Sequence, residues 1–304
     1  MTILVTGTNG LLGQKIIYEL INRPDISLVA TSKGPNRTAL KEGYIYEELD
    51  ITDEKQLESV FNKYQPDALI NTAAMTNVDA CENDKALCKK MNVEAVSMMI
   101  AQCEKFNTHF VHLSTDFVFN GTAGPYSEED VPEPLSFYAQ SKYESEQLLI
   151  KSKISWAILR TIIIYGVVDD LQRSNVVLWT LNSCRNQKHI NVITDQYRMP
   201  TLAEDLADAC ISAATLKAKG IYHVSGNEMM SIWETVQRVA DYFNLDKSFL
   251  HPVTTASLNQ PAKRPLVTGF KIEKAIKALN YNPHSFAEGL AIVEEQLKKR
   301  SAKN

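Results

Sequence analysis

Short runs of apolar residues alternate with segments of helical periodicity over the first half of the chain. Residues 3–6 are apolar almost throughout, which is typical of a parallel strand buried on both faces. Residues 11–20 then show the spacing of an amphipathic helix. By the same criteria we expect strands at 27–31, 44–48, 67–71, 110–113 and 156–164, and helices at 53–63, 80–106 and 137–151. This alternation predicts an α/β fold with a doubly wound parallel sheet.

The pattern becomes shorter and more mixed after about residue 165. We expect helices at 174–185, 203–216, 232–243 and 286–299, and strands at 190–194 and 221–224. Ser231 and Glu234 have the spacing of a capping box at the start of one of these helices. We therefore expect two units: residues 1–165, and a smaller mixed α/β substrate lobe over residues 166–304. Some segments of the second unit are expected to return to the first, and the cleft between the units is the default site.

The composition indicates a globular protein with reduced thiols. The 304 residues are 44% hydrophobic and 22% charged, with a net charge of −4, which argues against nucleic-acid binding and against an anionic membrane surface. None of the five cysteines forms a CxxC pair, and the six histidines are scattered, so no metal site is expected. We see no signal peptide or membrane-spanning segment and expect a cytoplasmic protein. The sequence leaves the oligomeric state open, a homodimer included.

A glycine-rich turn follows the first expected strand. Gly7, Gly10 and Gly13 form a GxxGxxG pattern between that strand and the first helix. Glycine at these positions permits a tight turn, close approach of a pyrophosphate to the backbone, and close packing of helix on sheet. The helix N-terminus then offers N–H groups to phosphates. The first unit is thus predicted to be an NAD(P)-binding Rossmann domain.

The residues after the second strand bear on the choice between NAD and NADP. An NAD site usually has an acidic residue there, but this chain has no acid between positions 31 and 37. Ser32, Lys33 and Arg37 could bind a 2′-phosphate, which favours NADP; an exposed basic loop is the alternative. Asp50 and Ile51, after the third strand, are expected to contact adenine. Ala73 and Ala74, after the fourth, are small enough for the backbone to approach the cofactor.

Tyr138 and Lys142 form a YxxxK pattern on an expected helix, where i, i+4 spacing places both on one face. Thr115 precedes them at the end of the fifth strand, where sheets of this kind bind ligands. A neighbouring ammonium favours the phenolate and so lowers the pKa of a tyrosine. We expect Tyr138 to act as general acid toward a carbonyl oxygen, Lys142 to lower its pKa and hold the nicotinamide ribose, and Thr115 to orient the substrate.

These motifs together resemble the extended short-chain dehydrogenases/reductases, and most of all the dTDP-4-dehydrorhamnose reductase branch. That branch also includes the non-catalytic β subunit of methionine adenosyltransferase. The resemblance covers nearly the whole chain and rests on segments 6–13, 71–79, 114–121, 159–166, 195–201 and 220–226, with Asn92, Tyr138, Lys142 and Arg264-Pro265.

The resemblance implies a role for each matching residue. Thr115, Tyr138 and Lys142 would be the catalytic triad. A pyrophosphate would lie along Gly7, Asn9, Gly10, Leu11 and Leu12. The ribose and nicotinamide would pass Ala73, Ala74 and Thr76. Asn92 would support Lys142 or else make only local helix bonds. Asp116 and Phe117 would lie near the sugar.

The chain departs from this branch at the expected sugar site. Ile163 stands where the rhamnose enzymes usually have tryptophan, so an aromatic platform is missing or comes from elsewhere. Arg198 replaces a usual small residue. Arg198 and Arg264 are candidates for a substrate diphosphate clamp; the alternative is that they are surface or lobe-bridging arginines.

The leading hypothesis is NADPH-dependent reduction of a nucleotide-linked 4-keto-6-deoxy sugar. The same residues would support reduction of another ketone, or epimerisation through a keto sugar. From other classes, the alternatives are a non-catalytic NADP-binding regulatory subunit and a redox-sensing scaffold.

Overall fold

A seven-stranded sheet forms the centre of the molecule in the computed structural model, which describes residues 1–169 and 174–301. Its strand order is β11-β6-β5-β4-β1-β2-β3, and every neighbouring pair is parallel. The strands are β1 (Thr2–Thr6), β2 (Ser27–Ser32), β3 (Ile45–Glu48), β4 (Ala68–Asn71), β5 (His109–Thr115), β6 (Trp156–Thr161) and β11 (Gly220–Val224). The predicted doubly wound α/β fold is confirmed.

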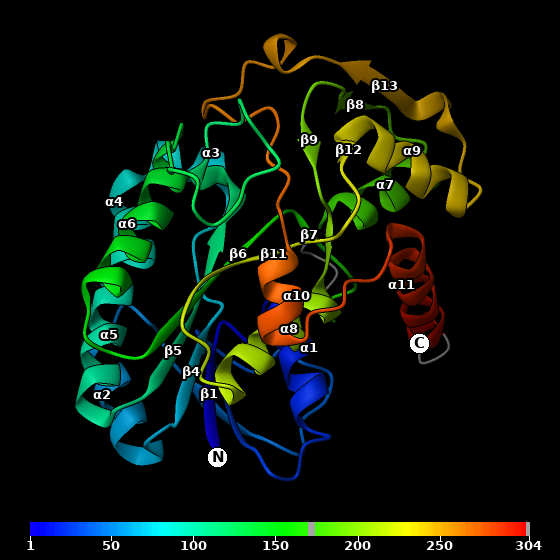
Figure 1. Ribbon diagram of the computed structural model, residues 1–304. Helices are drawn as coiled ribbons and strands as arrows, with labels where there is room; N and C mark the ends of the chain where they lie inside the picture. Colours follow the sequence, from blue (N-terminus) through cyan, green and yellow to red (C-terminus); the bar gives the residue numbers. More distant parts are fainter. Residues whose placement is uncertain (170–173, 302–304) are drawn as a thin grey trace.

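Helices cover both faces of this sheet (Figure 1). One face carries α1 (Leu11–Leu20), α8 (Ala203–Thr215) and α10 (Glu273–Leu279), and the other carries α2 (Glu54–Tyr64), α5 (Ala95–Phe106) and α6 (Phe137–Lys151). Ile16 of α1 and Leu206 of α8 are fully buried on the first face, and Phe61 of α2 and Met99 of α5 on the second. Each helix therefore buries the apolar stripe that its sequence presents.

A smaller body of helices and two-stranded ladders lies beyond one end of the sheet. Its helices are α7 (Val176–Arg185), α9 (Ile232–Tyr242) and α11 (Phe286–Ser301), and they share one apolar core. Its ladders pair β8 (Ile190–Ile193) with β13 (Leu250–Val253), and β9 (Tyr197–Arg198) with β12 (Met230–Ser231). The capping box of Ser231 and Glu234 is present at the start of α9.

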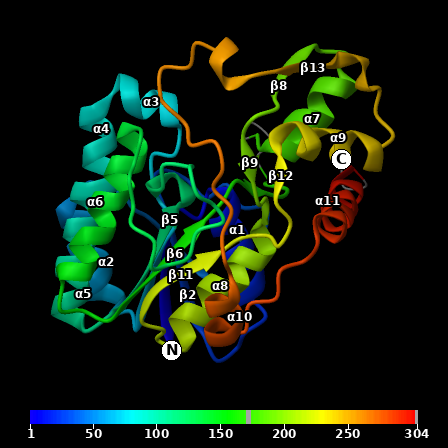
Figure 2. The same cartoon turned by 45° about the horizontal axis from the view of Figure 1, so that its top comes forward.

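The chain passes between these two bodies more than once. β11, α8 and α10 all follow residue 165 in sequence but lie in or against the large sheet. A further ladder pairs β7 (Ile164–Tyr165) with β10 (Thr201–Leu202). Figure 2 shows α3 (Val78–Asn83) and α6 on one side of the carboxyl ends of the strands, α7 and α9 on the other, and the segment before α10 running between them.

Two expected elements are divided. The helix expected at 80–106 is split into α3 (Val78–Asn83), α4 (Lys85–Lys89), a π-helical stretch (Lys90–Glu94) and α5. Asp84 ends α3 and caps α4 by accepting a hydrogen bond from Leu87 N. The strand expected at 156–164 ends at Thr161, because Ile163 adopts a positive φ of 26° and the chain turns toward β10.

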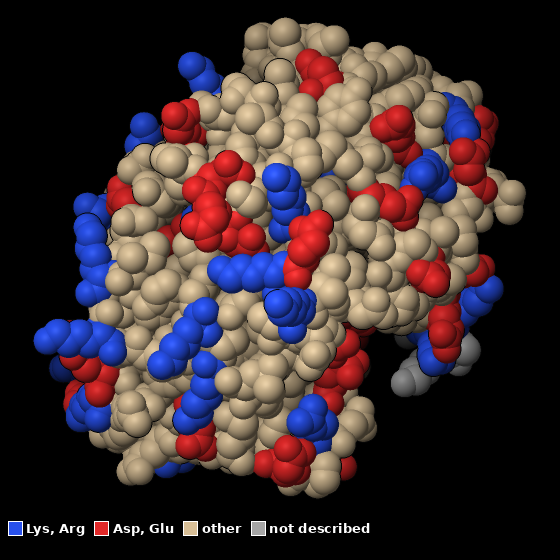
Figure 3. Space-filling view, in the orientation of Figure 1, with Lys and Arg blue, Asp and Glu red and all other residues tan. Residues whose placement is uncertain are grey.

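The surface carries mixed charge. Figure 3 shows basic and acidic side chains next to one another across the centre of the face seen in Figure 1, so this face offers no continuous basic field. Within residues 1–169 and 174–301, no helix has both the length and the apolar character to cross a membrane.

Candidate active site

A cavity of about 550 Å³ opens where β1, β4 and β5 end. The sheet order reverses between β1 and β4, and such switch points are where open α/β sheets bind ligands. Most of the predicted site residues line this cavity: Gly7, Asn9, Gly10, Leu11, Leu12, Ser32, Lys33, Arg37, Asp50, Ile51, Ala73, Ala74, Thr76, Thr115, Asp116, Tyr138 and Lys142.

The glycine loop has no space for side chains at two of its positions. Gly7 has a φ of +73°, and a Cβ there would lie 2.8 Å from Ala73 N. A Cβ on Gly13 would lie 2.5 Å from Thr8 Cα. Gly10 caps α1 without a side-chain hydrogen bond, which leaves the first-turn N–H groups available to an anion. The tight turn and the free N–H groups of the first turn are compatible with the predicted role of this loop.

Gly13→Ala is expected to lower the free energy of unfolding by about 1–3 kcal/mol, because the new methyl group meets fixed backbone. It should also weaken dinucleotide binding, since the start of α1 has to move. Gly220→Ala is the control for a loss of stability away from the loop: its φ of +104° strains any side chain although no atom lies within 4 Å of an added Cβ, and Gly220 does not line the cavity, so this variant should lose stability but keep its NADPH affinity. Urea unfolding and fluorescence titration with NADPH measure both variants. Unchanged NADPH affinity in Gly13→Ala would contradict the assignment of the loop.

The Asn9 side chain fixes the loop after β2. Its Nδ2 donates to Pro35 O at 3.0 Å, and its Oδ1 accepts from Arg37 N at 2.8 Å. Asn9 N donates to Ser32 Oγ at 3.0 Å. These bonds hold the loop that brings Ser32, Lys33 and Arg37 to the cavity wall at one end.

Lys33 has an acidic partner at this end. Its Nζ lies 2.8 Å from Asp50 Oδ2, although 80% of the Lys33 side chain is exposed. Burial raises the pKa of Asp50, but hydrogen bonds from Lys33 and Thr52 prevail and lower it to about 2. Asp50 is therefore charged at neutral pH and offsets part of the positive charge that Lys33 brings.

Thr115, Tyr138 and Lys142 meet at the other end of the cavity. Thr115 is the last residue of β5, while Tyr138 and Lys142 are one turn apart on α6, which begins at the Ser136 cap. Tyr138 packs edge-on against Phe117, with ring centres 6.1 Å apart. The three predicted catalytic side chains thus reach the same wall of the cavity.

The electrostatics of this group differ from the expectation that Lys142 lowers the pKa of Tyr138. Burial raises the pKa of Tyr138 above its ordinary value, opposed by a hydrogen bond with Thr115. Burial also lowers the pKa of Lys142, to about 8. Lys142 Nζ lies 3.2 Å from His112 Nε2. In this arrangement the lysine amine is directed to a histidine of β5.

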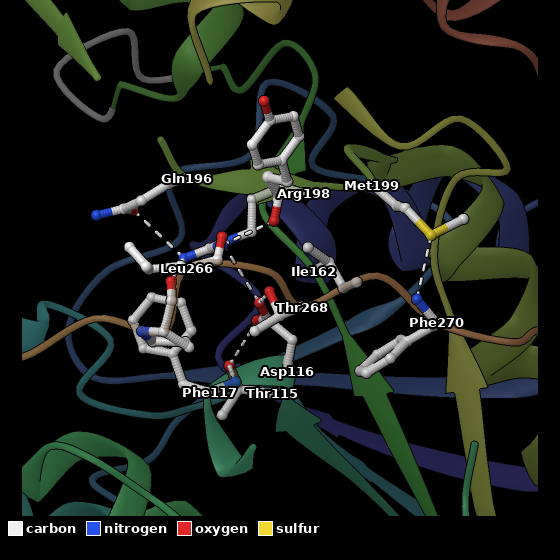
Figure 4. A network of polar contacts seen from close by, with 12 residues as sticks. Thr115, Asp116, Phe117, Ile162, Gln196, Arg198, Met199, Leu266, Thr268 and Phe270 are labelled. Carbon is white, nitrogen blue, oxygen red and sulfur yellow. Dashed lines mark hydrogen bonds and ion pairs between the residues drawn. The ribbon is translucent and has the colours of Figure 1, made fainter. Parts of the chain in front are cut away.

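Asp116 is buried in a polar network that joins the two bodies (Figure 4). Its carboxylate accepts from the Thr115 hydroxyl at 3.1 Å and from the Thr268 hydroxyl, and Arg198 Nε lies 3.5 Å away. Burial raises the pKa of Asp116, and the Arg198 guanidinium opposes that rise. Phe117 N donates to Thr115 Oγ1 at 3.2 Å, which further fixes the threonine hydroxyl.

Arg198 and Arg264 are bound to protein partners and do not line the cavity. The terminal nitrogens of Arg198 donate to three backbone carbonyls and to the Gln196 side chain. Arg264 forms a two-pronged ion pair with Asp79 of α3, at 2.7 and 3.1 Å. This geometry favours the lobe-bridging alternative over the diphosphate clamp for both arginines.

Asn92 and Phe117 also lie outside the cavity wall. Asn92 accepts from Met75 N at 2.8 Å and donates to Met75 O and Ser141 Oγ, both at 3.0 Å. Asn92 therefore holds the loop after β4 against α6. Its contact on α6 is with Ser141, the residue before Lys142.

Several lining residues were not singled out from the sequence. Met91, Thr161 and Asn175 are among them, and Asn175 caps α7 and donates to Gly166 O at 2.8 Å. An asparagine before a helical pattern is a recognisable cap, but nothing local shows that the helix starts at the cavity. Among residues 1–169 and 174–301, no three His, Cys, Asp or Glu side chains are grouped to hold a metal.

Comparisons with known proteins show similarity in both sequence and fold. The β subunit of methionine adenosyltransferase 2 from Bos taurus is 31% identical over 268 residues, covering 86% of this chain and 78% of that protein. The dTDP-4-dehydrorhamnose reductase structure from Clostridium acetobutylicum has a TM-score of 0.85 at 27% identity, covering 98% of this chain and all of that one. The Bacillus anthracis dTDP-4-dehydrorhamnose reductase, solved in complex with NADP, has a TM-score of 0.84 at 26% identity, covering 97% and 99%.

The NADP in the Bacillus anthracis structure supports a nicotinamide cofactor for proteins of this kind. Residues 1–299, nearly the whole chain, match the family model for the RmlD substrate binding domain. The chain therefore belongs to the RmlD substrate binding domain family, within the extended short-chain dehydrogenases/reductases.

Proposed function

We propose that this protein reduces a nucleotide-linked 4-keto-6-deoxy sugar with NADPH. The observation that carries the proposal is that one cavity joins the glycine loop, the Ser32–Arg37 end and the Thr115, Tyr138 and Lys142 group. The similarity to dTDP-4-dehydrorhamnose reductases supports the substrate class.

Thr115, Tyr138 and Lys142 each have a separate role in the proposed reaction. NADPH, when bound, supplies the hydride. The Thr115 hydroxyl orients the substrate carbonyl, and the Tyr138 hydroxyl donates its proton to the carbonyl oxygen as negative charge develops there. The buried setting of Tyr138 keeps it protonated until that moment. Lys142 donates to the ribose and, in its charged form, stabilises the phenolate that remains.

The test is NADPH consumption by the purified protein with a panel of nucleotide-linked 4-keto-6-deoxy sugars and with simple ketones. Turnover with the sugars, together with a 4-hydroxy product identified by mass spectrometry, is expected. Turnover with simple ketones alone would reject the substrate class. Absence of turnover despite tight NADPH binding would reject the reductase proposal.

Arg37→Ala is expected to weaken NADPH binding about ten- to a hundredfold while leaving NADH binding nearly unchanged. A charge-assisted hydrogen bond to the 2′-phosphate contributes about 1.5–3 kcal/mol, and NADH has no such phosphate. Lys41→Ala is the matched control, because Lys41 is an exposed cation of the same loop that does not line the cavity. Equal losses for NADPH and NADH in Arg37→Ala would remove Arg37 from the 2′-phosphate site.

A second candidate is a regulatory subunit of a methionine adenosyltransferase. The 31% identity to the β subunit of that enzyme, over 86% of the chain, favours it. Co-purification with a catalytic synthetase subunit, and a change in the activity of that subunit, would support this role. A monodisperse protein that turns over keto sugars and binds no synthetase would reject it.

A further inference from the structure

His112 is a buried histidine in direct contact with the YxxxK lysine. It lies on β5, three residues before Thr115, and is fully buried. Its Nε2 is 3.2 Å from Lys142 Nζ and 3.0 Å from Ser145 Oγ. Neither the sequence motifs nor the proposed mechanism assigns this residue a part.

The surrounding hydrogen bonds determine which nitrogen of His112 carries the proton. Ala73 N can only donate, and it donates to Asn71 Oδ1 at 3.2 Å, as the Thr6 hydroxyl does at 2.6 Å. The Asn71 amide therefore directs its Nδ2 hydrogens to His112 Nδ1, at 3.2 Å. Nδ1 must accept, so the neutral ring carries its hydrogen on Nε2.

The Nε2 hydrogen has a defined acceptor. Ser145 Oγ donates its own hydrogen to Lys142 O at 2.7 Å, so it presents lone pairs to His112. Lys142 Nζ thus lies 3.2 Å from a His112 nitrogen that already carries a hydrogen. A Lys142 ammonium has only N–H donors, so it would place a donor against the His112 Nε2–H. An uncharged Lys142 amine has a lone pair that can face this N–H instead.

We propose that His112 is a positioning residue that disfavours the ammonium form of Lys142 while the two are in contact, so that NADPH binding is coupled to proton uptake by Lys142. When NADPH is bound, its ribose hydroxyls can accept hydrogen bonds from a Lys142 ammonium. The negative charge of its phosphates also favours the charged form of Lys142. This inference rests on the proposed cofactor.

The other ionisable groups around Lys142 do not remove this effect. Glu146 on the same helix favours the ammonium, but its carboxylate is paired with Arg160. Cys88 of α4 also favours it, while Tyr138 and Asp116 have pKa values raised by burial. Burial nevertheless lowers the pKa of Lys142, to about 8, and that of His112 to well below its ordinary value.

The first test is calorimetry of NADPH binding in buffers of different ionisation enthalpy. A lysine whose pKa rises on binding takes up a proton only between its two pKa values. We therefore expect little uptake at about pH 7, below the Lys142 pKa of about 8, and uptake approaching about one proton at about pH 9. The 2′-phosphate is fully ionised at the higher pH and does not contribute.

Three variants test whether the proton uptake on NADPH binding depends on His112. In His112→Gln the side-chain carbonyl can turn to accept from an ammonium, so the uptake at about pH 9 should fall below that of the unmodified protein, although the burial of Lys142 remains. His109→Gln, which changes another buried histidine of β5, should retain it, and so should Tyr138→Phe. Uptake in His112→Gln equal to that of the unmodified protein would overturn the proposal.

Nitrogen NMR of the histidine rings in the unmodified protein is independent of any variant and of NADPH. We expect His112 to carry hydrogen on Nε2 alone, without titrating across the neutral range. A proton on Nδ1, or a charged ring, would overturn the proposal. Failure of NADPH to bind would instead reject the proposed function and the coupling with it, and the ring measurement would still show whether His112 presents an N–H beside Lys142.

Discussion

Replacing Tyr138 with phenylalanine is expected to lower kcat for the NADPH-dependent reduction by about 10²–10⁴-fold. Among the described lining residues of the cavity, Tyr138 has the only phenol, and it is in contact with Thr115 at the end of β5. The ring itself remains in Tyr138→Phe, so its packing against Phe117 is kept. The loss should therefore fall on kcat, with NADPH affinity nearly unchanged, and steady-state kinetics beside NADPH titration separate the two.

Tyr143→Phe is the matched control for this substitution. Tyr143 lies on the same helix, is partly buried, and packs against the apolar core rather than the cavity. It should keep full activity and stability. A Tyr138→Phe protein that turned over as fast as the Tyr143→Phe protein would show that another group donates the proton.

That the glycine loop and the Thr115, Tyr138 and Lys142 group line one cavity could be predicted because each is defined by short-range spacing at a strand end. Gly7 and Gly13 are required by contacts with Ala73 and Thr8, and the strand-to-helix context makes such contacts recognisable. Tyr138 and Lys142 needed only the period of one helix to share a face. The carboxyl ends of parallel strands lie at the same edge of the sheet, so the parallel topology alone brings these residues close together.

The arginines could not be placed in this way because their partners are distant in sequence. Arg264 pairs with Asp79, 185 residues earlier, and Arg198 donates to Pro265 O and Leu266 O. A cation near a motif predicts an anion partner but does not say whether that anion is a substrate or a carboxylate of the chain.

Local periodicity also misled the prediction at residues 80–106. Apolar residues recur at helical spacing throughout that segment, so no break is evident. The break depends on two residues. Asp84 caps α4, and Asn92, which lies within the π-helical stretch, turns its side chain inward to Met75. The Asp84 cap is local, three residues before its donor, and an acidic residue at that position is a recognisable cap signal. The inward turn of Asn92 depends on Met75, a tertiary partner that periodicity does not encode.

The largest effect on stability is expected at the ion pair between Arg160 of β6 and Glu146 of α6. Arg160 Nη2 and Nε lie 2.7 and 3.0 Å from the two Glu146 oxygens, and both side chains are almost completely buried. The Arg160 guanidinium also lies over the Phe119 ring, 5.1 Å from its centre. Glu146→Leu would leave a buried guanidinium without its counter-charge, so the free energy of unfolding should fall by about 3–5 kcal/mol.

A double substitution distinguishes loss of the charge partner from loss of packing. Arg160→Met combined with Glu146→Leu removes both charges, and apolar replacements of a buried pair are often neutral or stabilising, so the double variant should recover most of the loss. Glu47→Gln is the surface control: the Glu47–Lys63 pair is partly exposed to solvent and should contribute less than about 1 kcal/mol. If urea unfolding showed Glu146→Leu to be as stable as Glu47→Gln, the pair would not anchor α6. In that case the positions of Tyr138 and Lys142 would have to depend on the Ser136 cap and on the packing of α6 against β5 and its neighbouring helices.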